Sequence, residues 1–349
     1  MNLTETLKTL CTSPGVAGHE RSAGRSGSAS EAALKLLSAY MPNAKIDSFG
    51  TVKGSIIYNE NLPPEGPAPL LLLDAHIDEV GLIVNFIDEK GFLKVSGVGG
   101  IDRRVLPAAQ VTVWGKEPCK GVICTLPPHA QKSEDKTVKE DEIYIDCGFT
   151  KENAEKIITL GDSVTIDVKF TELQNGKVTS RALDDRAGVA AILYALDLLK
   201  DKKLNYNIAV IFSSQEELGC RGAGIAAYGF NPDLAIAVDV SYGDYPGAKE
   251  NTSWKLGGGT MLGISPVLDR TLFEKMKCIA SDNNILYQIE VMNGKTGTNA
   301  DVISLTQNGI KCALLSIPLR NMHTPVEVIQ LSDIEATGQL IAEFIAGVC

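Results

Sequence analysis

The chain has 349 residues, of which 44% are hydrophobic and 22% charged, a composition typical of soluble globular proteins with about two domains. Lys and Arg number 33 against 43 Asp and Glu, which gives a formal net charge of -10. Nucleic acids and anionic membranes need a basic surface, so this balance argues against either as a main partner. No apolar run approaches the ~20 residues of a membrane span and no secretory signal is visible, so we expect a cytoplasmic protein.

Apolar residues at helical spacing predict two amphipathic helices in the first forty residues, one around Leu3, Leu7 and Leu10 and one over 30–40. The small polar stretch 21–28 between them is expected to be a surface loop. Strands are expected at 46–49, 52–58 and 70–74. Short β-rich runs then follow, separated by Gly and Pro, at 82–86, 92–95, 110–114, 121–125, 143–146 and 163–170. These runs predict a small barrel or sandwich, with the charged tract 131–142 as an exposed loop.

After residue 181, helices and strands alternate, which predicts a layered α/β domain. Helices are expected at 186–199, 222–228, 272–283, 300–308 and 332–346, and strands at 207–213, 234–240, 287–291 and 311–317. The strands before residue 74 can join the same sheet. We therefore expect one α/β domain of residues 1–80 and 172–349, interrupted by a β-rich insertion at 81–171. Apolar residues of the insertion, such as Val111 and Val113, are expected to be exposed and to need a partner.

His76 and Asp78 follow an apolar run that ends at residue 73. Two residues apart on a strand end, they point to the same face, where a carboxylate can hold the ring nitrogen that does not bind metal. Asp184 and Asp185 stand before a predicted helix, where either could be a helix cap or bridge two cations. A capped strand end with a satisfied histidine would explain His76 without any function.

Further acidic and His residues stand at the ends of later strands: Glu216 and Glu217, Asp239, and His323. Sites in open α/β sheets form at the carboxyl ends of strands. Each residue alone has an ordinary explanation, such as a solvated loop. Together they form a set of oxygen and nitrogen donors suited to zinc, cobalt or manganese. Two ions bridged by one carboxylate form the usual co-catalytic hydrolase site.

The order of these motifs makes the resemblance specific. The chain resembles the M42 metallo-aminopeptidases, of the kind that builds tetrahedral cytosolic particles. The matching segments are Ala75-His76-Ile77-Asp78-Glu79-Val80-Gly81, Ala182 to Gly188, Gln215-Glu216-Glu217-Leu218-Gly219, Arg221-Gly222-Ala223, Asp239, and Arg320 to Glu327. The resemblance implies a dinuclear-metallopeptidase α/β/α sandwich. It also implies that the insertion is a small β-barrel serving dimerisation and substrate access.

The resemblance implies two divalent ions per subunit, with His76 and Asp239 on one, Glu217 and His323 on the other, and Asp184 bridging both. Glu216 would be the general base, Asp78 the partner of His76, and Asp185 structural. The implied reaction removes N-terminal residues from short peptides. The implied assembly is a homo-oligomer, a tetrahedral dodecamer built from dimers.

Two other functions stay open. The M20 and M28 dinuclear peptidases and deacylases share part of this pattern, so a deacylase or carboxypeptidase is the alternative enzyme. In M20 enzymes, however, the added domain follows the Glu-Glu pair, whereas here the insertion lies between His76 and Asp184. A non-catalytic scaffold that binds through the insertion is the alternative of another class. Asn299 stands where the M42 family often has Asp, which leaves the preferred side chain open.

Overall fold

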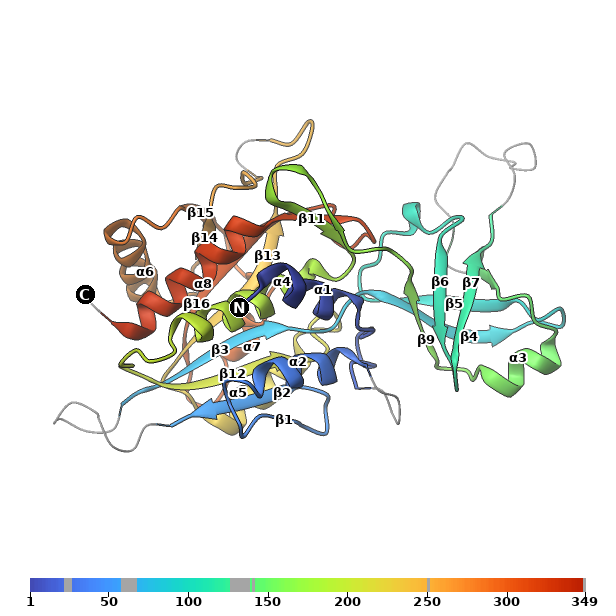
Figure 1. The fold of residues 1–349 in the computed structure, drawn as a ribbon, viewed down its shortest axis with the longest axis horizontal. Coiled ribbons are helices and arrows are strands. Elements are labelled where there is room, and N and C mark those ends of the chain that lie inside the picture. The colour runs from blue at the N-terminus through green and yellow to red at the C-terminus, as the bar shows by residue number, and fades with distance from the viewer. Residues whose placement is uncertain (22–26, 58–67, 126–138, 140–141, 250–251, 348–349) are drawn as a thin grey trace.

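The computed structural model describes residues 1–349 except 22–26, 58–67, 126–138, 140–141, 250–251 and 348–349. Most of the loops predicted at 21–28 and 131–142 therefore lies outside the described residues. A large sheet covered by helices forms the main body, and a small barrel stands beside it (Figure 1). Within the described ranges, no helix is long and apolar enough to cross a membrane.

Within the described residues, eleven strands form one mixed sheet. Its centre is parallel, in the order β12 (Asn207–Ser213), β3 (Leu70–His76), β13 (Leu234–Tyr242) and β16 (Lys311–Arg320). Antiparallel strands flank this centre. They are β2 (Val52–Ile56) and β1 (Lys45–Ile46) beyond β12, and β17 (Glu327–Gln330), β11 (Lys177–Ser180) and β10 (Thr171–Glu172) beyond β16. β14 (Thr260–Ile264) also pairs with β16 and carries β15 (Tyr287–Val291).

Helices cover both faces of the sheet because apolar side chains of the central strands alternate between them. Leu71 and Leu73 pack on the face that carries α1 (Leu3–Thr12), α2 (Ala29–Leu37), α4 (Leu183–Leu198), α6 (Arg270–Asp282) and α8 (Leu331–Ala346). Leu72 packs on the other face with α5 (Arg221–Phe230) and α7 (Ala300–Ile303). The expected α/β/α sandwich is confirmed.

The barrel is formed by β4 (Gly81–Ile87), β5 (Leu93–Val98), β8 (Tyr144–Asp146), β7 (Pro118–Ile123), β6 (Gln110–Trp114) and β9 (Ser163–Ile166), in that spatial order. A short helix, α3 (Lys151–Ile157), packs beside it, and the barrel has its own apolar core. Val111 and Val113 are fully buried in that core. The expectation that they are exposed is wrong, because closure of the barrel covers them without a partner.

Candidate active site

The parallel strands bring the predicted site residues to one edge of the sheet. His76 is the last residue of β3, Glu216 and Glu217 follow β12, and His323 follows β16. Asp239 lies within β13, which runs three residues beyond it, and not at a strand end as predicted. Asp184 is the second residue of the helix α4 and lies at the same edge, so all five predicted metal ligands come together.

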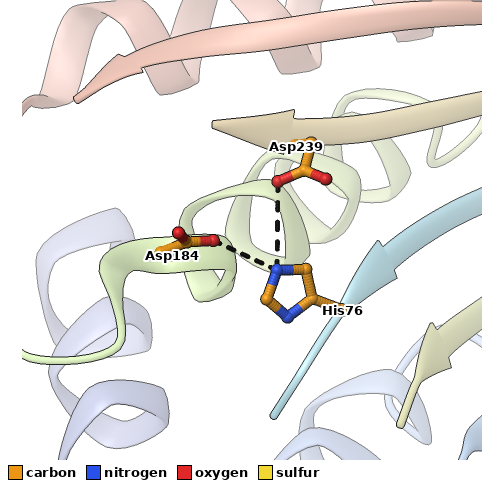
Figure 2. Close-up of side chains that lie close together, drawn as sticks. All are labelled: His76, Asp184 and Asp239. Atoms are coloured by element: carbon orange, nitrogen blue, oxygen red, sulfur yellow. Dashed lines mark hydrogen bonds and ion pairs between the residues drawn. The ribbon is translucent and has the colours of Figure 1, made fainter. Parts of the chain in front are cut away.

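The ligand atoms form two triads, in each of which they lie within 4.8 Å of one another. The first triad joins His76, Asp184 and Asp239, all of them buried (Figure 2). His76 Nε2 lies 3.1 Å from Asp184 Oδ1 and 3.9 Å from Asp239 Oδ1. His76 Nδ1 is buried without a hydrogen bond and lies 3.5 Å from Asp78 Oδ1. One ring nitrogen thus faces a carboxylate pair and the other faces an orienting carboxylate, the usual arrangement around a metal-binding His.

The second triad joins Asp184, Glu217 and His323. His323 Nε2 lies 3.4 Å from Glu217 Oε1 and 3.5 Å from Asp184 Oδ2. His323 Nδ1 lies 3.1 Å from the carbonyl oxygen of Gly100, which follows β5 of the barrel. A carbonyl only accepts, so Nδ1 donates and Nε2 stays available as a ligand. The barrel therefore orients one residue of the second triad.

The triads hold more buried negative charge than nearby cations neutralise. Burial, and then the charge of Asp185, raises the pKa of Asp239 well above its usual value. Burial, and then the charge of Asp184, raises the pKa of Glu217 to about 8. Hydrogen bonding to Asp184 raises the pKa of His323 to about 9. Closely spaced carboxylates of this kind are stabilised by cations, so the donor set and its charge fit divalent metal ions.

Asp184 differs from the other carboxylates of the triads. Burial acts to raise the pKa of Asp184, but hydrogen bonds from His323 and His76 outweigh it and lower the pKa. Burial likewise acts against protonation of His76, yet the carboxylates of Asp184 and Asp78 raise the pKa of His76 well above its usual value. Asp184 is therefore the carboxylate on which both histidines converge.

Asp78 holds the loop after β12 as well as facing His76. Its side chain is fully buried and accepts from the backbone N–H of Glu216 at 3.0 Å and of Glu217 at 3.1 Å. The Cys220 thiol lies 3.1 Å from Glu216 Oε1, and burial raises the pKa of Glu216. Asp185 accepts from the N–H of Gly188 at 3.0 Å, the bond of a helix cap, which agrees with the structural role expected for it.

The sequence alone assigned no role to Glu327, and it did not predict that Asn299 is buried. Glu327 is 2% exposed and accepts from the N–H of Asp184 at 3.2 Å and of His323 at 3.0 Å, so it holds the backbone of two triad residues. Two signals pointed to it: its place four residues after His323, and its position at the end of the matching segment Arg320 to Glu327. Asn299 is also buried, where its amide donates to Ser213 Oγ at 2.8 Å.

A cavity opens beside the second triad. Residues of the sheet edge line it, and so do Ile101 and Ile166 from the insertion. Three triad residues line it together with Glu327: Asp184, Glu217 and His323. The second triad and the barrel therefore line the same cavity.

Comparison with known proteins identifies the family to which this chain is similar. The family model of the M42 glutamyl aminopeptidases matches residues 54–340. The lysyl aminopeptidase of Pyrococcus furiosus is 30% identical over 342 residues, which cover 96% of this chain and 94% of that protein.

Two solved structures are similar over nearly the whole chain. An aminopeptidase from Desulfurococcus kamchatkensis superposes with a TM-score of 0.89 at 31% identity, covering 99% of this chain and 95% of that one. The TET1 peptidase of Pyrococcus horikoshii superposes with a TM-score of 0.83 at 29% identity, and the match covers 99% of each chain. That peptidase is described as assembling into a tetrahedron or a large octahedral shell. With a family model over most of its length and relatives matched from end to end, the chain belongs to the M42 family of aminopeptidases, which are hydrolases acting on peptide bonds.

Proposed function

We propose that this aminopeptidase works with two divalent metal ions and that Asp184 bridges them. The observation that carries this proposal is that Asp184 belongs to both triads through different oxygens. Its Oδ1 faces His76 at 3.1 Å and its Oδ2 faces His323 at 3.5 Å. His76 and Asp239 would hold one ion, and Glu217 and His323 the other. Zinc, cobalt and manganese all accept such a donor set.

Glu216 is the proposed general base. When bound, the two ions would polarise the peptide carbonyl and lower the pKa of water in the site. Glu216 then takes a proton from that water and passes it to the leaving amine. Burial raises the pKa of Glu216, which favours proton uptake by its carboxylate. Asp78 faces the ring of His76 and accepts from the backbone N–H of Glu216. It therefore positions both a proposed metal ligand and the proposed base.

Elemental analysis combined with metal exchange tests the proposal. The purified protein is expected to hold two divalent ions per chain and to hydrolyse amino-acid anilides. Removal of the ions with a chelator should abolish hydrolysis, and zinc, cobalt or manganese, added singly, should restore it. Full hydrolysis by metal-free protein, or activity saturating at one ion per chain, would contradict the two-ion proposal.

The same site is expected to require a free N-terminus. The carboxylates of Glu216 and Glu217 each lie near enough to that of Asp78 for their charges to interact, and this acidic cluster can attract a substrate ammonium group. A short peptide should therefore be shortened from its N-terminus, whereas its N-acetylated form should not be cleaved. Chromatography of both digestions measures this difference. Equal cleavage of the two forms would favour a deacylase or an endopeptidase.

We also assign dimerisation and substrate access to the insertion, residues 81–171, and catalysis to residues 1–80 and 172–349. The similar TET1 structures, one described as a dodecamer and one as a tetrahedron or a large octahedral shell, support a hollow dodecamer, which we propose is built from six dimers. Enclosure would admit short unfolded peptides, which suits a late step of cytosolic protein turnover. Light scattering or sedimentation should give a particle of twelve chains. A fully active monomer of 37.3 kDa would contradict this assembly, and a dimer would support the interface without the cage.

A further inference from the structure

Two carboxylates from distant parts of the chain hold the loop that carries the proposed base. Three consecutive backbone N–H groups of this loop donate to them. Gln215 donates to Glu20 Oε1 at 2.8 Å, Glu216 to Asp78 Oδ1 at 3.0 Å, and Glu217 to Asp78 Oδ2 at 3.1 Å. Gln215 has a φ of 55°, in the left-handed region that a residue with a side chain seldom adopts. Outside contacts must support such a backbone, and Glu20 provides one of them.

Glu20 is itself firmly held. Its side chain is 1% exposed, and the same Oε1 atom also accepts from the N–H of Gly18 at 2.9 Å. The segment before it is joined to the connection between β3 and β4, because Ala17 N–H donates to the carbonyl of Glu79 at 3.1 Å and Glu79 N–H to that of Gly15 at 3.0 Å. The segment that carries Glu20 is therefore tied to the chain that directly follows His76.

We propose that Glu20 is a positioning residue, whose Oε1 atom fixes the backbone from which Glu216 and Glu217 reach the site. The inference rests on the roles proposed for those two residues. Both N–H donors converge on the same Oε1 atom, so we expect the position of this acceptor to matter more than its negative charge. A catalytic group displaced by about 1 Å can lose ~10²-fold in rate, so loss of this acceptor should lower turnover.

Three variants of the full-length protein separate the acceptor from the charge. Glu20→Gln keeps the Oε1 acceptor without charge and should keep kcat close to wild type. Glu20→Asp keeps the charge but shortens the side chain, and it should lower kcat. Glu20→Ala removes both and should lower kcat by ~10²-fold. All are assayed with an amino-acid anilide at saturating divalent metal, where KM should change little because Glu20 does not line the cavity beside the second triad.

Asp333 offers a matched control. It is fully buried and accepts from the N–H of Gly257 and of Gly259, both at 2.8 Å, but it lies outside the candidate site. Asp333→Asn and Asp333→Ala should lower the melting temperature without changing kcat. Circular dichroism measures folding for all variants. If Glu20→Ala does not fold, the kcat values of Glu20→Gln and Glu20→Asp test the inference instead.

Wild-type kcat in Glu20→Ala would overturn the inference, and so would an inactive Glu20→Gln beside an active Glu20→Asp, which would show that charge matters. Glu216→Gln is assayed in parallel to keep the two proposals apart. If Glu216→Gln is active, the proposed function itself fails. If Glu216→Gln is inactive while Glu20→Ala keeps wild-type kcat, only the positioning role fails.

Discussion

Glu216→Gln is expected to lose nearly all turnover while keeping the fold and both metal ions. An amide cannot accept the proton that a carboxylate base takes, and removal of a general base typically lowers kcat by ~10²–10⁴-fold. The side chain of Glu216 belongs to neither triad, so metal binding should not change. The backbone N–H bond to Asp78 does not involve the substituted group. Steady-state kinetics and elemental analysis of the variant measure the two effects separately.

Glu290→Gln is the matched control for this change. Glu290 is 5% exposed and accepts a hydrogen bond from Ser316 Oγ at 2.7 Å, outside the candidate site. Glu290→Gln should leave kcat unchanged. If it lowers kcat as well, the loss in Glu216→Gln would reflect a general effect of removing a buried carboxylate. Hydrolysis by Glu216→Gln at nearly the wild-type rate would show that another group is the base.

Asp184→Ala is expected to release both ions and with them the activity, whereas His76→Ala should mainly weaken one ion. The difference follows from geometry, because Asp184 belongs to both triads and His76 to one. Without the bridging carboxylate, each triad keeps only two of its three donors. Elemental analysis after dialysis counts the ions that each variant retains.

Asp185→Ala provides the neighbouring control. Asp185 accepts from the N–H of Gly188 and from the N–H of His76 at 3.3 Å, so its loss removes a helix cap. Loss of a cap typically lowers stability by about 1 kcal/mol, which a thermal melt detects. Both ions should stay bound. Two ions retained in Asp184→Ala, together with their loss in Asp185→Ala, would instead identify Asp185 as the bridge.

The long, strongly apolar elements of the fold could be predicted from the sequence. The limits of β12 agree with those predicted, because its apolar run is bounded by polar residues that mark a strand locally. The short elements could not. α3 has 7 residues and β17 has 4, too few for a hydrophobic period to stand out. β14 follows three consecutive glycines, which favour a loop when they are read without the neighbouring strand β16.

For the site, the sequence by itself determined that His76, Glu217 and His323 gather, because residues at or after the ends of parallel strands share one edge of the sheet. Only the tertiary structure decided how they are held. Glu327 supports Asp184 across 143 positions, Glu20 supports Gln215 across 195, and Gly100 orients His323 across 223. Local patterns reach only a few residues along a helix or strand, so no local pattern encodes these contacts. They arise only when the sheet and the barrel have closed around the site.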